Sequence, residues 1–254
     1  MTAAPAAAVS VTARLALREV PMILMYHAVA TAGFDPNMLC VSPERFAEQM
    51  AWLQGSGLRG VSVRELTEAM RAGQHRGLVG ITFDDGYTSV LDAALPVLNR
   101  QGFGATVFVI SGRIGGRNDW DEGTDWPLLS AAGVRELASA GIEIGSHSAS
   151  HVRLEGLEPD ELTRQVRQSR ADLAALLGHE VPGFAYPYGA MDAAARQAVD
   201  DAGYSYACAV QVPRRGLGYL TLPRIYTGPR DSAARMTAKR YLYRGYIAYR
   251  GRRA

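Results

Sequence analysis

The stretch Ile81-Thr82-Phe83-Asp84-Asp85-Gly86-Tyr87 joins an apolar, β-branched run to two adjacent carboxylates and a glycine. The run that begins at Val79 predicts a buried strand, and Gly86 predicts its end. Strands that finish in acidic residues place charge at the rim of a sheet or barrel, where α/β enzymes build their sites. Because adjacent strand residues point to opposite sides, the two carboxylates can have different roles, one on a metal and one on a proton. Considered alone, the segment fits an Asp-Asp-Gly turn equally well.

Strand-like and helix-like segments alternate along the chain, which predicts an α/β fold with a parallel sheet. Apolar strands are expected at residues 22–26, 79–83, 105–110, 142–145, 184–186, 204–210 and 221–225. Helices are expected after Ser42-Pro43, after Ser62, across residues 90–98, 134–140 and 159–177, and after Asp192. A count of about seven strands favours a barrel over an open sheet.

The composition is that of a globular protein, since 48% of the 254 residues are hydrophobic and 20% are charged. This length suits one large α/β domain. No apolar run is long enough to cross a bilayer, and the Ala-rich N-terminus lacks the basic start and continuous apolar core of a secretion signal. We therefore expect a cytoplasmic protein, with Cys40 and Cys208 as buried free thiols or, alternatively, as one disulfide.

Charge is distributed unevenly along the chain. The net charge is only +2, so the molecule as a whole is not a polyanion binder, and we expect no nucleic-acid partner. From Arg224 to Ala254, however, nine Lys or Arg residues accompany a single acid, Asp231. With its interleaved tyrosines, this segment fits either a solvated tail or a foot for an anionic membrane surface at the inner face. RNA is a weaker third alternative for the tail.

The second motif is Ser146-His147-Ser148-Ala149-Ser150-His151, which follows the predicted strand at 142–145. Two imidazoles four residues apart can face one point if the backbone turns helically after the strand. The pair alone also fits two unrelated structural histidines. Together with a carboxylate at another strand end, it predicts a facial site for Zn²⁺ or another divalent ion, with positions open for water and substrate.

The third motif, Phe184-Ala185-Tyr186-Pro187-Tyr188-Gly189, predicts a strand that ends in a Pro-aromatic-Gly turn. It is either an ordinary turn or a rigid loop that offers a backbone N–H to a developing oxyanion. The three motifs in this order resemble those of the polysaccharide deacetylases, the NodB-homology group known as carbohydrate esterase family 4. The resemblance covers roughly residues 22–226, most of the chain.

This resemblance implies a distorted (β/α)₇ barrel and a metal-dependent deacetylase of N-acetylated sugars. Carried over by position, Asp84 resembles the general base, and the backbone N–H of Tyr188 resembles the oxyanion donor. Asp85, His147 and His151 resemble the metal ligands, with zinc expected first and cobalt or nickel as alternatives. Residues 21–230 would then form the catalytic domain, between an N-terminal extension at 1–20 and a basic Tyr/Arg-rich tail at 231–254.

Two positions depart from the family pattern. Many members carry an Arg that holds the base aspartate at the position where this chain has Ala185. Many also end with Leu-x-Ile-x-His, whose His is the general acid, whereas this chain has Leu222-Pro223-Arg224-Ile225-Tyr226. These departures leave a catalytically weak sugar-binding module as an alternative, beside hydrolysis of a non-sugar amide on the same barrel.

The segment Met25-Tyr26-His27-Ala28-Val29 resembles the N-terminal Tyr-His motif of the branch that deacetylates poly-β-1,6-N-acetylglucosamine. In that branch the motifs are circularly permuted and an N-terminal strand supplies the acid His. His27 is therefore expected to be the general acid rather than a buried structural imidazole. The expected reaction is amide hydrolysis, in which Asp84 takes a proton from an activated water and His27 gives one to the departing sugar amine.

Overall fold

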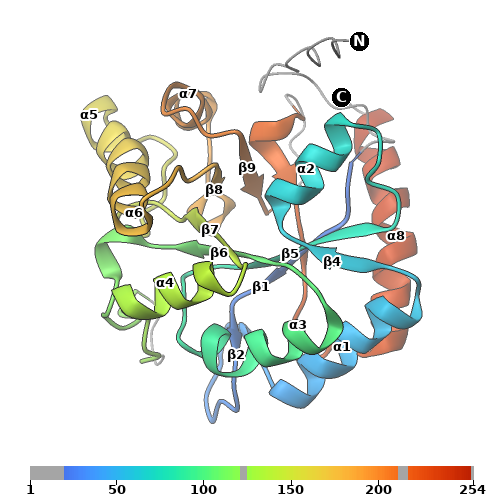
Figure 1. Cartoon of the computed structure of the whole chain (residues 1–254). Helices are drawn as coiled ribbons and strands as arrows, with labels where there is room; N and C mark the ends of the chain where they lie inside the picture. The colour runs from blue at the N-terminus through green and yellow to red at the C-terminus, as the bar shows by residue number, and fades with distance from the viewer. Residues whose placement is uncertain (1–19, 121–124, 211–216, 253–254) are drawn as a thin grey trace, which may run out of the picture.

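The computed structural model describes residues 20–120, 125–210 and 217–252, and its centre is a parallel β-sheet (Figure 1). The strands follow the order β10-β9-β8-β7-β6-β5-β1-β11. Their bounds are β1 Ile23–Tyr26, β5 Leu78–Phe83, β6 Thr106–Val109, β7 Glu143–Ser146, β8 Gly183–Ala185, β9 Tyr206–Ala209, β10 Leu222–Pro223 and β11 Ile225–Tyr226. Each overlaps one of the apolar segments predicted as strands, to within one residue at the ends that extend beyond them, and β10 and β11 share the last segment.

The last strand segment closes the sheet on itself. β10 pairs with β9, while β11 pairs with β1, and only Arg224 lies between the two. One short segment thus joins both edges of the sheet. The barrel is distorted because β7 and β8 share a single paired position, Ser146↔Phe184, and it is nearly closed because β10 and β11, at the two ends of the strand order, are joined through Arg224 rather than paired with each other. The predicted α/β barrel is therefore confirmed.

Three short strands lie outside this circle. β4 (Arg59–Val61) pairs with the first half of β5. β2 (Ala28–Val29) and β3 (Cys40–Val41) form a separate two-stranded sheet just after β1. This small sheet lies next to His27 in the chain, so it helps to fix the loop that follows the first barrel strand.

Helices cover the outside of the barrel. They are α1 Pro43–Gly55, α2 Val63–Arg71, α3 Leu95–Gln101, α4 Ala131–Ser139, α5 Pro159–Thr163, α6 Ser169–Leu177, α7 Ala193–Asp201 and α8 Ala233–Arg252. Ser42 and Ser62 cap α1 and α2 as predicted, each accepting a backbone N–H from the third residue along. A π-helical turn, η2 (Val90–Ala94), precedes α3, where Pro96 has no N–H to donate. A second, η4 (Arg164–Gln168), joins α5 to α6.

Strand residues alternate between two apolar layers, as the two-residue period of a strand requires. Outward-facing side chains such as Leu24 and Phe83 pack with the helices in the larger core. Inward-facing side chains such as Phe108, Ala185 and Cys208 fill the interior of the barrel. Polar residues that continue the inward set past the strand ends therefore lie at the mouth of the barrel.

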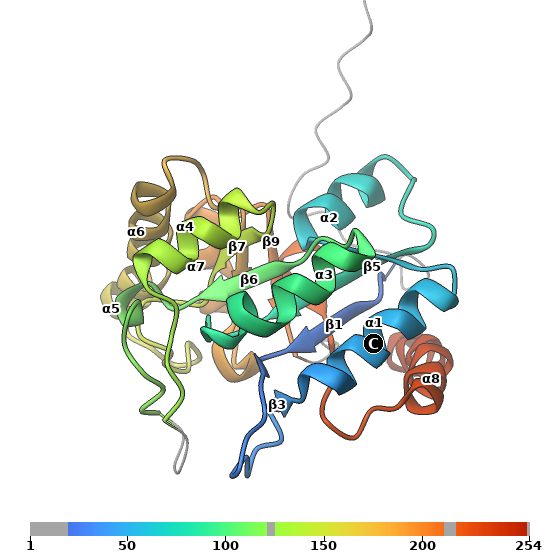
Figure 2. The ribbon, with the colours of Figure 1, turned by 60° about the horizontal axis from the view of Figure 1, so that its bottom comes forward.

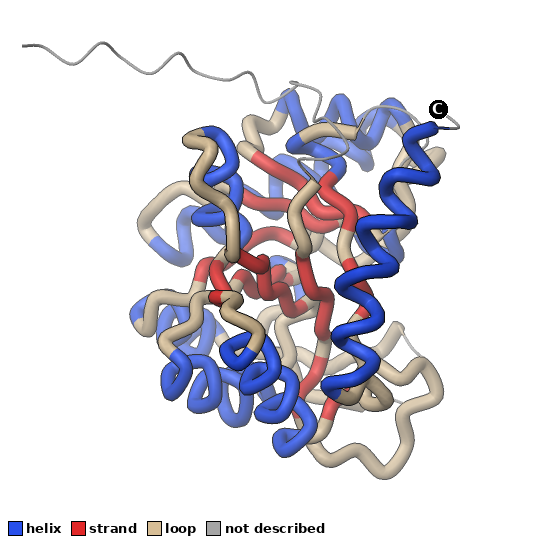
Figure 3. The backbone as a smooth tube through the Cα atoms, turned by 90° about the vertical axis from the view of Figure 1, so that its right-hand side faces the viewer, coloured by secondary structure: helices blue, strands red, loops and turns tan. Residues whose placement is uncertain are grey.

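The C-terminal segment forms α8, which lies against α1 and along the outside of the barrel (Figures 2 and 3). Met236 is fully buried. Trp52 Nε1 donates to Thr237 Oγ1 at 2.9 Å, and the Tyr243 hydroxyl donates to the Pro223 carbonyl at 3.2 Å. One face of the first half of α8 is thus packed against the rest of the protein, because one methionine within a basic segment supplies an anchor that the charge pattern does not indicate.

Other sequence expectations concern the termini, the cysteines and the membrane. The N-terminal extension expected at 1–20 lies outside the described residues, apart from residue 20. Cys40 and Cys208 are buried and free, as predicted. Within the described ranges, no helix combines the length and the apolar character needed to cross a bilayer.

Candidate active site

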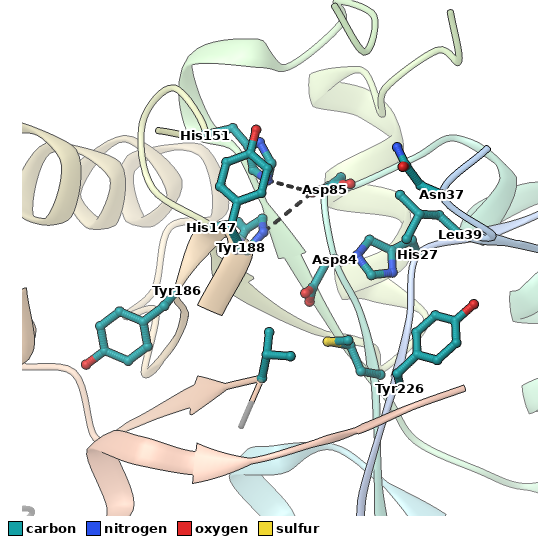
Figure 4. A pocket seen from close by; sticks show the side chains of 12 residues that line it. His27, Asn37, Leu39, Asp84, Asp85, His147, His151, Tyr186, Tyr188 and Tyr226 are labelled. Atoms are coloured by element: carbon teal, nitrogen blue, oxygen red, sulfur yellow. Dashed lines mark ion pairs between the residues drawn. The ribbon is translucent and has the colours of Figure 1, made fainter. Parts of the chain in front are cut away.

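The carboxyl ends of the barrel strands surround a cavity of about 380 Å³ (Figure 4). In a parallel barrel these ends share one rim, so residues far apart in the sequence meet there. The cavity is lined by all six residues that the sequence singles out: His27 after β1, Asp84 and Asp85 after β5, His147 and His151 after β7, and Tyr188 after β8. The predicted site residues are therefore brought together in one place.

Asp85 lies beside both imidazoles of the second motif. Its Oδ1 atom is 3.4 Å from His147 Nε2 and 3.3 Å from His151 Nε2 (Figure 4). All three residues are buried, and one ligand atom from each lies within 4.8 Å of the other two. A single cation between them would meet three donors from two strand ends.

A tight turn, rather than the helical continuation considered from the spacing, brings His147 and His151 together. Ser148 and His151 both adopt left-handed backbone angles, with φ of 66° and 60°. The Ser148 hydroxyl oxygen accepts the backbone N–H of His151 at 3.0 Å. Non-glycine residues rarely adopt this conformation, and such strain collects at functional sites.

The protonation states of the three residues fit a divalent cation. His147 Nδ1 donates to the Ala185 carbonyl at 2.8 Å, which leaves the Nε2 lone pair facing Asp85. Burial lowers the pKa of His147 to about 4, so its imidazole is neutral at neutral pH. Burial would raise the pKa of Asp85, but His151, His27 and His147 together outweigh it and hold that pKa well below its ordinary value.

Two polar atoms at this site lack well-aligned partners among the described residues. Asp85 Oδ1 and His151 Nδ1 are buried and accept or donate no hydrogen bond of good geometry there. A buried carboxylate oxygen without a donor is costly unless a cation meets it. Imidazole and carboxylate donors suit zinc, cobalt and nickel alike, so the donor set fits a divalent metal without selecting one.

Arg224 forms a buried, bidentate ion pair with Asp84, which the sequence did not predict. Its Nη1 and Nη2 atoms donate to Asp84 Oδ1 and Oδ2 at 2.6 and 2.7 Å. Nη1 also donates to Thr82 Oγ1 at 3.2 Å, inside the barrel. Burial would raise the pKa of Asp84, but the Arg224 charge, with smaller contributions from His147 and His27, lowers it.

The segment that contains Arg224 and Tyr226 accounts for both departures from the family pattern, at Ala185 and at Tyr226. Ala185 carries no guanidinium for the base aspartate, and Arg224 supplies one from the segment that closes the barrel. Tyr226, at the position of the expected acid, lines the cavity, and its hydroxyl donates to the Met38 carbonyl. The only sequence signal for Arg224 is a charged residue placed between apolar neighbours in a strand.

His27 lies on the wall of the cavity formed by β1, beside both carboxylates (Figure 4). In this view Asp84 and Asp85 separate it from His147 and His151. Its charge contributes to lowering the pKa of Asp84 and of Asp85. His27 is therefore within electrostatic reach of the site. It is not one of the three residues that could hold a metal, Asp85, His147 and His151, which we call the metal set.

Tyr188 lies in a 3₁₀ turn, Pro187–Gly189, directly after β8. Its backbone has a positive φ of 58°, and its side chain is 46% exposed. The centroid of the Tyr188 ring lies 4.6 Å from that of the His151 ring and 5.7 Å from the guanidinium carbon of Arg153. The turn therefore covers one side of the metal set with an aromatic ring.

Comparison with known proteins identifies the family. The sequence model of the polysaccharide deacetylase family matches residues 71–207, more than half of the chain. The protein YxkH of Bacillus subtilis (strain 168) is 29% identical over 213 residues, which cover 82% of this chain and 71% of YxkH. The poly-β-1,6-N-acetyl-D-glucosamine N-deacetylase of Staphylococcus aureus (strain MSSA476) is 23% identical over 212 residues, 75% of this chain and 72% of the relative.

Solved structures agree with this assignment. IcaB from Ammonifex degensii superposes with a TM-score of 0.73 at 26% identity, over 85% of this chain and 95% of IcaB. The Streptococcus pyogenes deacetylase PplD, in complex with acetate, has the same fold, with a TM-score of 0.74 at 24% identity over 86% of this chain and 96% of PplD. The chain belongs to the polysaccharide deacetylase family, and its barrel is the fold of carbohydrate esterase family 4.

Proposed function

We propose that this protein removes the N-acetyl group from an N-acetylated amino sugar by metal-assisted hydrolysis. One observation carries the proposal: a single cavity holds a buried Asp85-His147-His151 set, a second ionised carboxylate on Asp84, and an imidazole on the facing wall (Figure 4). These are the groups that amide hydrolysis needs, namely a cation site, a proton acceptor and a proton donor.

The three-residue set would hold a divalent cation, which supplies Lewis acidity toward the acetyl carbonyl and toward a water molecule. Asp84 accepts the proton of the attacking water. Arg224 holds both oxygens of Asp84, so the carboxylate stays ionised and fixed although it is buried. The backbone N–H of Tyr188 donates to the oxygen that becomes negative when the water adds to the carbonyl carbon.

His27, when protonated, gives its proton to the sugar nitrogen as the carbon–nitrogen bond breaks. The products are acetate and a free amine. We assign this role to His27 because it lies across the two carboxylates from His147 and His151, on the opposite side of the cavity (Figure 4). Tyr226 has a hydroxyl bonded to the Met38 carbonyl, which makes it a poorer donor to the substrate.

The rim of the cavity favours a sugar as substrate. Asn37 and Leu39 line the cavity from the β2–β3 loop, and Phe34 in the same loop is 61% exposed. With the exposed ring of Tyr188, these side chains offer apolar faces and one amide to a pyranose. The name of the S. aureus relative, a poly-β-1,6-N-acetyl-D-glucosamine N-deacetylase, supports an N-acetylated sugar polymer as the substrate class.

Two other functions make different demands on the site. A weak sugar-binding module has no need of a paired base or of His27, so Arg224 and His27 argue against it. Hydrolysis of a non-sugar amide would use the same groups, and only substrate choice separates it from our proposal.

The test is acetate release from N-acetylglucosamine oligomers by metal-depleted protein, with Zn²⁺, Co²⁺ or Ni²⁺ added back, and with the Asp85→Ala variant as control. We expect metal-dependent acetate release from wild type and none from the variant. Metal binding without turnover on any N-acetyl sugar would favour the binding module. Turnover restricted to non-sugar amides would overturn the substrate class.

A further inference from the structure

The side chain of Gln165, which has no part in the proposed mechanism, forms hydrogen bonds with the turn that carries His147 and His151. Gln165, fully buried in η4, accepts the backbone N–H groups of Ala149 and Ser150 with its Oε1, at 3.1 and 3.0 Å. These residues lie between His147 and His151 in the chain. One amide oxygen therefore holds the middle of the turn that sets the spacing of the two imidazoles.

The orientation of this amide is fixed by its neighbours. Gln165 Nε2 donates to Ser150 Oγ at 2.6 Å and to Glu161 Oε1 at 2.8 Å. Hydrogen bonds from Arg164 and then from Gln165 lower the pKa of Glu161 to about 2, so its carboxylate only accepts. A flipped amide would turn Nε2 toward two N–H donors and Oε1 toward a carboxylate, which is repulsive on both sides.

The helix geometry also directs the main chain of Gln165 toward the turn. The backbone N–H of Ala149 lies 3.1 Å from the Gln165 carbonyl as well as from Oε1. This contact falls in the π-helical turn η4, where the wider winding displaces carbonyls from the regular α-helical ladder. Single π-turns inside α-helices are frequent at functional sites.

We propose that Gln165 is a positioning residue for the metal set: it holds the turn from Ser148 to His151 in its left-handed form, so that both imidazoles face Asp85 before a cation binds. The inference rests on the proposed metal site. Left-handed non-glycine residues are strained, and they persist only when their surroundings fix them. Without the amide, the Ser150 N–H loses its acceptor and the Ala149 N–H keeps only the Gln165 main-chain carbonyl, so the turn has a reason to relax.

The test is a titration of metal-depleted protein with Co²⁺, followed by visible absorption, for wild type, Gln165→Leu and Gln168→Leu. Gln168 is the matched control, because it is an exposed glutamine of the same π-turn that donates only to Asp172 of its own helix, at 2.7 Å. Groups that orient metal ligands typically change affinity by about 10–100-fold. We expect that loss and an altered Co²⁺ spectrum for Gln165→Leu, and wild-type values for Gln168→Leu.

A wild-type dissociation constant and spectrum for folded Gln165→Leu would overturn the proposal, even if its melting temperature fell. If Gln165→Leu does not fold, Ser150→Ala and Glu161→Ala decide the question, because each removes one partner of the amide. Weaker Co²⁺ binding by either variant supports the positioning role, and unchanged binding by both overturns it. Failure of wild type to release acetate while it binds Co²⁺ would affect the proposed reaction and not this inference.

Discussion

Arg224 and Asp84 form a buried bidentate ion pair across 140 residues of sequence, at 2.6 and 2.7 Å. The arginine comes from the segment that closes the barrel, between β10 and β11, and the aspartate follows β5. The pair therefore exists only when the barrel is closed. It couples the segment between β10 and β11 to the ionisation of the group that we propose as the general base.

Arg224→Met should lower the free energy of unfolding and move the acid limb of activity to higher pH. Removing one partner of a buried ion pair costs about 3–5 kcal/mol. Arg224 lowers the pKa of Asp84, and burial alone would raise it, so without Arg224 the carboxyl group becomes protonated at a higher pH. Urea unfolding and kcat/KM between pH 4 and 9 measure the two effects. The exposed Arg230→Met is the control, and equal pH profiles for the two variants would contradict the coupling.

Mutation should distinguish the roles of the two adjacent aspartates. Asp84→Asn removes the proton acceptor but leaves the metal set intact, so we expect turnover to fall by about 10²–10⁴-fold with metal content retained. Asp85→Ala removes the carboxylate of the metal set, so we expect metal loss as well. Elemental analysis beside acetate release distinguishes them. Near wild-type turnover by Asp84→Asn would show that another group is the base.

His27→Ala should lower kcat by about 10²–10⁴-fold, because the departing amine loses its proton donor. Metal content should not change, since His27 lies outside the three-residue set. His179→Ala is the matched control: that imidazole is exposed and forms a hydrogen bond with the neighbouring Glu180 carbonyl, away from the cavity. Small and equal effects of the two substitutions on acetate release would exclude His27 as the acid.

Much of the site could be predicted because its motifs are local. Asp84, Asp85 and His147 each follow an apolar run that reads as a strand, and the carboxyl ends of parallel strands meet at one rim. His27 follows the same rule at the first strand. The adjacent carboxylates also meet different partners, as predicted, but both follow the end of β5 and Asp85 has a φ of 70°, so a left-handed turn separates them and not the alternation of a strand.

The remainder depends on tertiary contacts that have no local signal. Arg224 meets Asp84 only through barrel closure, and the sequence around it indicates merely a charge in a strand. Gln165 is one polar residue in a helix with an otherwise ordinary apolar face. Met236 anchors α8 although its neighbours are basic and aromatic, so charge alone favoured a solvated tail. In each case the contact depends on one side chain. Sequence periodicity describes a whole helix or strand, so it does not identify that side chain.

The metal-free protein should lose stability as the pH falls from about 6.5 toward 4, because of His147. Its pKa is about 4 in the folded state, owing first to burial, against an ordinary value of 6.5. Between these values the unfolded chain binds a proton that the folded chain does not, so stability falls by up to about 1.4 kcal/mol per pH unit. Above pH 6.5 His147 contributes nothing to the pH dependence of the free energy of unfolding, and below pH 4 the loss of stability that it causes is complete.

Urea unfolding of metal-free wild type and His147→Gln across this range gives the measurement. The variant should lack this part of the slope, while His179→Gln should retain it. An identical slope for wild type and His147→Gln would mean that His147 is not the group responsible.

The outer face of α8 is the place to test binding to an anionic membrane surface. Tyr241 and Leu242 are 69% and 70% exposed there, and the Arg235 side chain is 62% exposed. Removing the whole helix would be a poor test, because Met236 is part of the core and its loss would confuse unfolding with lost binding. Point substitutions on the exposed face avoid this problem.

We expect the protein to sediment with vesicles rich in phosphatidylglycerol more than with pure phosphatidylcholine, and less so at high salt. A basic residue near such a surface contributes about 1 kcal/mol, or roughly fivefold in partitioning, so Arg235→Gln should weaken binding by about that factor. Tyr241→Ser with Leu242→Ser should weaken the salt-resistant part, since exposed tyrosine and leucine favour the interfacial region. Equal sedimentation with both kinds of vesicle, or full binding by these variants, would leave α8 as a structural helix whose charges are simply solvated.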